Sequence, residues 1–367
     1  MSRSVDVDCV TRYGRLFEKD FTVMADTKTA PRVMRFRMAD VASQAGVSLA
    51  TVDRVLNGRG VVRRDTRAAV LEIARRLGYV PALESEAVSP ARFDVILQGG
   101  TNGYLQLLAD EIELAATSRS DDFALVVHRI APFSPEALAE EIDGIDKSDG
   151  VAVIALDHPL VREAIRGLRA RGIAIATLVS DMSNIGSIGY VGIDNRAAGR
   201  LAAQLIGRLV GNRQGTVLLF LGYRSYRGHE ERETSFRHVL DEEFPNLAIV
   251  EVRDTRDDIE KSRRETLSAL GAHPDTVGIY NIAAGNRGIA DGLIASGLAG
   301  KVVFVAHELT EHSRKLLLTG VLDVAIDQSP RREAREMLKV LWSHARQLTD
   351  EPVEPIPITP ILRENIP

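Results

Sequence analysis

The sequence has almost no cysteine and no long hydrophobic run. Cys9 is the only cysteine among 367 residues, which excludes an intrachain disulfide and a cysteine-rich zinc site. No stretch reaches the roughly 18 uninterrupted apolar residues of a membrane-spanning helix, and residues 1–30 lack the apolar run of a signal peptide. We therefore expect a cytoplasmic protein that is neither exported nor inserted into a membrane.

The excess of acidic over basic residues is also small, since the formal net charge is only −5. The distribution is nevertheless uneven. Residues 34–80 carry a balance of +5, whereas residues 81–367 sum to −11. A small basic segment joined to a large acidic body indicates a module that binds a polyanion and a second module with another role.

Length and composition predict several domains. The chain is two to three times as long as a typical domain, and its content of 45% hydrophobic and 26% charged residues is that of a folded globular protein. We predict a flexible extension over 1–33, a small helical segment over 34–80, which we call the headpiece, a hinge or linker over 81–91, and a larger domain over 92–367.

Three short amphipathic helices are predicted in the headpiece. Gly46 should end the first helix and Ser48 should cap the second, which gives the pair the dimensions of a helix-turn-helix. Apolar residues spaced three and four apart form the inward faces: Met38, Val41, Ala42 and Ala45, then Val52, Val55 and Leu56, then Val70, Ile73, Ala74 and Leu77.

The outward face of the second helix carries side chains suited to DNA. Arg54 can fork onto a guanine, and Asn57 can donate to a phosphate or a base. Leu49 and Ala50 can contact thymine methyl groups. A helical packing module with a solvated polar face is the alternative interpretation of this pattern.

Resemblance to a known family favours the DNA-binding interpretation. The segments MADVA at 38–42, AGVS at 45–48, TVDRVLNG at 51–58 and LGYVP at 77–81 resemble the headpiece of LacI-type transcription regulators. The resemblance implies base contacts from Leu49, Ala50 and Arg54 and phosphate contacts from Asn57 and Thr66. With Ser48, these residues form the expected DNA-binding set.

The resemblance also concerns the residues after Pro81. In that family they form a hinge helix that enters the minor groove of DNA, with a wedging leucine. Here Val88 stands at the position of that leucine, so we expect it to contact DNA. A plain linker is the alternative for this segment.

From residue 93, short apolar runs alternate with longer helical periods. Such alternation is typical of βαβ units, which build parallel sheets with helices on both faces, and about ten strands favour two sheets. The predicted strands span 93–97, 123–128, 151–156, 173–179, 190–193, 216–221, 248–252, 277–282, 302–306 and 324–326.

This body resembles the effector domain of LacI-type regulators and the type I periplasmic sugar-binding proteins. The clearest pieces are YVGIDN at 190–195 and AIDQSP at 325–330. The resemblance implies an α/β fold of two lobes joined by three crossing segments, with the ligand in the cleft. The first lobe would comprise about 92–193 and 329–352, and the second about 194–328 and 353–367.

Polar side chains follow the predicted strands, where open α/β sheets bind ligands. Planar forked groups there can bond the vicinal hydroxyl groups of a sugar or polyol. A ligand with a carboxylate or phosphate is the alternative, because one predicted loop and helix start contain Arg224, Arg227, His229 and Arg232. We expect Arg232 to face Asp157 and Glu308 across the cleft. The complete expected ligand-binding set is Asn102, Tyr104, Asp157, His158, Asp181, Arg232, Asn286, Glu308 and Gln328.

The sequence does not indicate catalysis. The segment HELTEH at 307–312 imitates a zinc-protease motif, but its histidines are five residues apart, about 140° around a helix, and cannot share one metal. We predict no catalytic residue, metal or cofactor. The expected protein is a homodimeric, ligand-responsive repressor of a pseudo-palindromic DNA operator; a cytoplasmic solute-binding protein or sugar-related enzyme without DNA binding is the alternative.

Overall fold

A computed structural model describes residues 36–56, 62–77, 79, 90–120, 122–223, 225–252, 258–348 and 352–367. The expected extension over 1–33, most of the expected hinge, and the candidate residues Asn57 and Val88 lie outside these ranges. The chain divides into two compact units, Met1–Ala87 and Val88–Pro367.

The first unit contains the three predicted helices, α1 (Met38–Ala45), α2 (Leu49–Leu56) and α3 (Arg64–Arg76). Gly46 ends α1 with a left-handed φ of 63°, which glycine adopts without steric cost. The Ser48 hydroxyl accepts a hydrogen bond from the Thr51 amide at 3.2 Å, so its role as a cap is confirmed. Val41, Val52 and Val70 are fully buried in a small shared core, as their spacing predicted.

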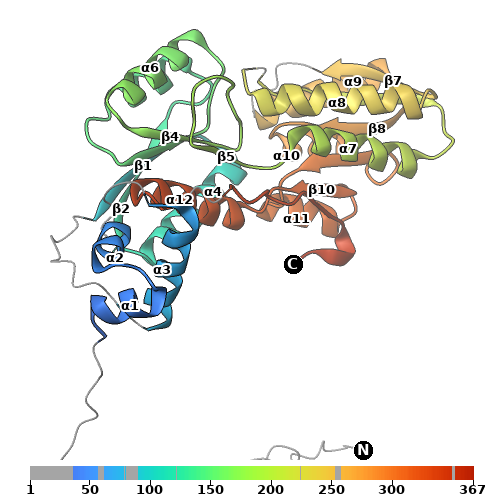
Figure 1. Cartoon of the computed structure of the whole chain (residues 1–367). Coiled ribbons are helices and arrows are strands. Elements are labelled where there is room, and N and C mark those ends of the chain that lie inside the picture. Colours follow the sequence, from blue (N-terminus) through green and yellow to red (C-terminus); the bar gives the residue numbers. More distant parts are fainter. Residues whose placement is uncertain are drawn as a thin grey trace, which may run out of the picture. The chain divides into compact units, whose positions relative to one another are not determined.

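The second unit begins with a five-stranded parallel sheet in the order β2-β1-β3-β4-β5 (Figure 1). Helices α4 and α12 pack against each other and against this sheet, as do α5 and α6. The strands are β1 (Ala91–Gln98), β2 (Phe123–Ile130), β3 (Gly150–Val153), β4 (Ala174–Leu178) and β5 (Gly189–Val191); the helices are α4 (Gly103–Thr117), α5 (Pro135–Asp143), α6 (Pro159–Ala170) and α12 (Pro330–Ala345). We call this part lobe 1.

A second sheet, in the order β11-β10-β9-β8-β6-β7, forms lobe 2 (Figure 1). It is parallel except for β11, which runs antiparallel to β10. Its strands are β6 (Gly215–Phe220), β7 (Leu247–Val252), β8 (Thr276–Asn281), β9 (Val303–His307), β10 (Val324–Asp327) and β11 (Thr359–Ile361). Its helices are α7 (Asn195–Val210), α8 (Arg227–Glu243), α9 (Ile259–Ala272), α10 (Asn286–Ala295) and α11 (Glu311–Leu318), followed by the short 3-10 turn Arg363–Asn365.

Three segments cross between the lobes: β5 to α7, β10 to α12, and α12 to β11. Ile193 of the first crossing pairs with Ile356 of the third through an isolated parallel bridge. The second crossing contains Gln328 and Ser329, and the Asp327 carboxylate accepts the Ser329 amide at 3.0 Å. The crossings therefore lie beside the ends of the strands that carry polar residues.

The predicted α/β class with parallel sheets is confirmed, and the predicted strands are present with ends shifted by up to three residues. Strand β11 was not predicted. It is three residues long and contains Pro360, which suits an edge strand but gives no alternating pattern. In the part of the chain that the structure describes, no helix is long and apolar enough to cross a membrane.

Candidate functional site

A cavity of about 540 Å³ lies between the lobes. Its wall includes the first turns of α4, α8, α10 and α11 and residues at the carboxyl ends of β1, β8, β9 and β10. The volume is within the range of sites for small molecules. Of the expected ligand-binding residues, the cavity is lined by Asn102, Tyr104, Arg232, Asn286, Glu308 and Gln328.

Arg232 of α8 is the buried cation of this wall, with only 4% of the residue exposed. Its Nε donates to Asn195 Oδ1 at 2.7 Å, and its two terminal nitrogens donate to the Ile282 carbonyl at 3.1 Å and to Gln328 Oε1 at 3.0 Å. These three bonds fix the plane of the guanidinium, because its donors form a rigid fork.

Gln328 connects Arg232 to Glu308. Its Nε2 donates to Glu308 Oε1, while the buried Oε2 of Glu308 has no partner among the described residues. Glu308 also adopts a left-handed φ of 75°, which is uncommon for a residue with a side chain. Burial is the main cause that raises the pKa of Glu308 well above its usual range, which favours the protonated form of the carboxyl group.

The two asparagines of the cavity wall are held by the protein. Asn102 caps α4, since its Oδ1 accepts the amides of Tyr104 at 3.1 Å and Leu105 at 3.3 Å. Asn286 donates to the His307 carbonyl at 3.0 Å and accepts from Asn281 Nδ2 at 2.6 Å. Both amides are thus pre-positioned at the starts of helices.

A buried acid lies behind Tyr104. The Tyr104 hydroxyl donates to Glu333 Oε2, and Glu333 of α12 is completely buried with Oε1 unpartnered among the described residues. Burial raises the pKa of Glu333 to about 8. The group is therefore mostly protonated at pH 7, and it ionises in a range where the unfolded chain has already lost this proton.

Glu333 is expected to make the protein less stable as pH rises from 6.5 to 8. Its pKa in the unfolded chain is about 4.3, so over this interval only the folded state holds the proton, and the free energy of unfolding falls by roughly 2 kcal/mol. Glu308 acts in the same direction. Burial lowers the pKa of His229 to about 3 and that of His307 well below its usual range, so their opposing effect lies mainly below pH 6.5 and only partly offsets the fall above it.

Glu333→Gln should remove this part of the pH dependence. Urea unfolding at pH 6.5 and 8 measures it, with the exposed Glu230→Gln as the control variant. An equally steep fall in Glu333→Gln and in the wild type would contradict the assignment to Glu333.

The structure does not bring Asp157, His158 or Asp181 to the cavity. Asp157 does not face Arg232, because Arg162 of α6 is close enough to take its carboxylate at 2.7 and 2.8 Å. His158 Nδ1 caps α6 through the Leu160 amide at 3.4 Å. Asp181 accepts from the Thr177 hydroxyl at 2.7 Å. The expected arrangement of Arg232 opposite Asp157 is therefore wrong.

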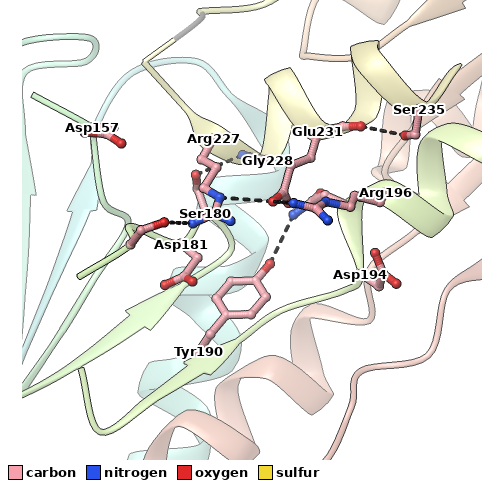
Figure 2. Close-up of polar contacts among 12 residues, drawn as sticks. Asp157, Ser180, Asp181, Tyr190, Asp194, Arg196, Arg227, Gly228, Glu231 and Ser235 are labelled. Carbon is pink, nitrogen blue, oxygen red and sulfur yellow. Dashed lines mark hydrogen bonds and ion pairs between the residues drawn. The ribbon is translucent and has the colours of Figure 1, made fainter. Parts of the chain in front are cut away.

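Asp157 and Asp181 lie instead near a contact between the lobes at the start of α8 (Figure 2). The Gly228 amide donates to Ser180 Oγ at 3.3 Å, Arg227 donates to Ser183 Oγ, and the Asp157 amide donates to the Ser225 carbonyl at 2.9 Å. Arg227 is also oriented by Glu231 at 3.0 Å. This contact holds the lobes together beside the cavity.

Sequence reasoning missed several residues of the wall, including Gln98 and Phe133. Phe133 of lobe 1 lies 5.3 Å from the Tyr223 ring of lobe 2, centroid to centroid, and 6.3 Å from the Tyr226 ring. Phe133 has a left-handed φ of 58°, an outlier for an aromatic residue. It lies in a loop without a motif, and no local pattern in the sequence signals this position.

In the headpiece, the expected DNA-binding residues divide into exposed and partly exposed positions. Ser48, Leu49, Ala50 and Arg54 are exposed, with Leu49 at 52%. Thr66 is half-buried on α3. The face of α2 that is open to solvent is thus opposite the buried Val52 and Val55.

Two families match the chain. The family described as "Periplasmic binding protein domain" matches residues 93–348, and "Bacterial regulatory proteins, lacI family" matches residues 37–82. The chain is 30% identical to the HTH-type transcriptional regulator MalR of Streptomyces coelicolor over 50% of this chain and 54% of that protein. It is 25% identical to the Ribose operon repressor of Halalkalibacterium halodurans over 66% of this chain and 70% of that protein.

Other relatives match over shorter segments. The Catabolite control protein A of Streptococcus mutans is 40% identical over 21% of this chain and 24% of that protein. The matched segments thus span about a quarter to a half of the length of several curated relatives. Among solved structures, a putative LacI transcriptional regulator from Bacteroides fragilis has a TM-score of 0.68 at 18% identity, covering 76% of this chain and 98% of that chain.

The glucose-galactose binding protein GanP from Geobacillus stearothermophilus also has a TM-score of 0.68, at 19% identity, covering 76% of this chain and 99% of that chain. Identities this low show the fold alone. The family match over residues 93–348 extends across most of the chain and across both lobes that form the cavity. The chain therefore belongs to the family of periplasmic binding protein domains, and it carries a lacI-family domain at residues 37–82.

Proposed function

We propose that this chain is a sequence-specific DNA-binding transcription regulator whose operator affinity is controlled by a small ligand in the cavity between the lobes. The observation that carries the proposal is the presence, in one chain, of a helix-turn-helix with an exposed second helix and a two-lobed domain with an interior cavity. The names of the relatives, which include several HTH-type regulators and a Ribose operon repressor, support it.

The geometry of α2 supports DNA binding. Val52 and Val55 are buried against the other two helices, so α2 is anchored while Arg54 and Leu49 remain exposed. A helix presented in this way can enter a major groove. The basic balance of residues 34–80 favours association with phosphates.

The cavity supports a sugar-like ligand. Its wall combines amide, carboxyl and guanidinium groups with the Phe133 and Tyr226 rings, and forked polar groups with aromatic faces suit hydroxylated rings and chains. Similar folds include proteins solved with D-allose and D-arabinose. In this proposal, the cavity binds its ligand and does not carry out catalysis.

The wider organisation belongs to the same proposal. The chain would act in the cytoplasm as a homodimer on a pseudo-palindromic operator, and residues 81–91 would link the headpiece to the ligand-binding domain. Ligand binding changes operator affinity only through a difference in affinity between the two forms of the protein, and operator DNA must change ligand affinity by the same factor.

DNA binding is tested by selection of duplexes from a random library with the full chain, followed by titration of the selected sequence. We expect Arg54→Ala to weaken binding to this sequence by roughly 1–3 kcal/mol and to relax one base position, because a forked contact to guanine is lost. Binding to random DNA should change little.

The control variant is Arg67→Ala, which removes an exposed arginine from α3 and not from α2. It should leave the selected sequence unaltered. Failure of the wild type to enrich any sequence would reject the proposed function, and equal losses on selected and random DNA in Arg54→Ala would reduce Arg54 to a phosphate contact.

A further inference from the structure

Among the residues that the structure describes, Arg232 is a buried positive charge without a carboxylate partner. Its three acceptors, from Asn195, Ile282 and Gln328, are all neutral. Within the described ranges, no carboxylate oxygen lies within 4.0 Å of its guanidinium. Because an unpaired charge is much more costly to bury than a neutral polar group, the site as it stands favours an anion beside Arg232.

Glu308 does not pair directly with Arg232. Gln328 lies between the two side chains, accepting from Arg232 and donating to Glu308. Burial raises the pKa of Glu308 well above its usual range, which favours the neutral acid, and its buried Oε2 has no partner among the described residues. Glu333 behind the wall is likewise mostly protonated at pH 7, with a pKa raised to about 8.

Two further features of the wall suit a negatively charged ligand. Gln98 is 4% exposed and lines the cavity, and its Nε2 is a buried donor without a partner among the described residues. The helices α4, α8, α10 and α11 all begin at the cavity, and the first turn of a helix carries partial positive charge. Both features are independent of Arg232.

We propose that the ligand of this cavity is a small hydroxylated carboxylate, such as a sugar acid, whose carboxylate pairs with Arg232. The inference rests on the proposed function in taking the cavity as the ligand site. A guanidinium has five N–H donors, so two remain on Arg232 after its three protein bonds. Gln98 and Glu308 provide donors for the other oxygens of the ligand.

Calorimetric titration of the full chain tests this inference with pairs of compounds that share a carbon skeleton. The carboxylates are D-gluconate, D-galactonate and D-xylonate, and their neutral counterparts are D-glucitol, galactitol and xylitol, all at the same sodium concentration. We expect at least one carboxylate to bind roughly 100-fold more tightly than its alcohol, because it alone gains a desolvated charged contact.

Two variants assign the difference to Arg232. Arg232→Gln should reduce the preference for the carboxylate to less than roughly tenfold, mainly by weakening the carboxylate. Arg196→Gln, which removes the 63% exposed arginine that pairs with Glu231 outside the cavity wall, should leave the preference unchanged. A preference that survives in Arg232→Gln would overturn the pairing.

The other outcomes also decide the question. Equal or tighter binding of the alcohols or of D-glucose and D-galactose overturns the anionic ligand, as does the absence of binding by every carboxylate. Tighter binding of D-glucose 6-phosphate than of any carboxylate overturns the choice of carboxylate. The DNA selection described above is a separate measurement. If it enriches no sequence, the proposal of a DNA-binding regulator is rejected, whereas the ligand class is decided by the calorimetric titrations alone.

Discussion

Arg232→Ala is expected to give a protein that binds operator DNA normally but whose affinity for operator no longer changes when ligand is added. The substitution removes the group that bonds Asn195, Ile282 and Gln328 at once, and with it the fixed cation of the cavity. Losing a desolvated charged contact costs about 2–5 kcal/mol, so ligand affinity should fall at least roughly 30-fold. The headpiece folds around its own core and does not depend on this residue.

The measurement is fluorescence anisotropy of the selected operator, titrated with the sugar, alditol or aldonate that binds the wild type most tightly. Arg196→Ala serves as the control, because it removes an exposed arginine on the neighbouring helix. Circular dichroism and thermal unfolding establish that both variants are folded. A normal ligand response in a folded Arg232→Ala protein would remove Arg232 from the binding site.

Gly199→Ala is expected to destabilise the ligand-binding domain by roughly 3 kcal/mol, a large effect for one added methyl group. Gly199 lies on α7 where this helix packs against α8: a Cβ atom there would be 2.3 Å from both the Arg232 carbonyl oxygen and Ser235 Oγ. Backbone cannot rotate aside as a side chain can, so α8 must move. Since α8 carries Arg232 into the cavity, ligand affinity should fall as well.

Thermal and urea unfolding measure the change, with Gly271→Ala as the matched control. Gly271 lies on α9, and nothing lies within 4 Å of a Cβ atom at that position. Alanine should therefore be neutral there or stabilise by up to about 1 kcal/mol through its higher helix propensity. A Gly199→Ala protein as stable as the wild type would show that α7 and α8 can separate at little cost.

The elements with strong periodicity could be predicted from sequence. The inward faces of α1, α2 and α3 follow the helical repeat, and Ser48 was identified as a cap because its chemistry acts on its own helix. Strand β11 could not be found, since Thr359, Pro360 and Ile361 gain their pairing only from β10, far away in the sequence.

The cavity was predictable only in part. Glu308 and Gln328 follow from the rule that strand ends carry the site, and Arg232 was expected near the start of the helix after β6. The structure brings the three together at the cavity. Asp157 also follows a strand, but its carboxylate pairs with the nearby Arg162. A position after a strand does not reveal such a local ion pair. Phe133 reaches the wall through a loop conformation that leaves no pattern in the sequence.

Gln328 lies on the segment that joins β10 to α12, so one of the groups expected to touch the ligand is part of the covalent link between the lobes. This segment is therefore placed to act as a hinge. A small rotation about the Gln328 backbone moves nearby atoms little, whereas the ends of lobe 1 and lobe 2 that lie farthest from it are displaced most. A ligand bound at this hinge can thus cause the largest movement at the protein surfaces farthest from the ligand.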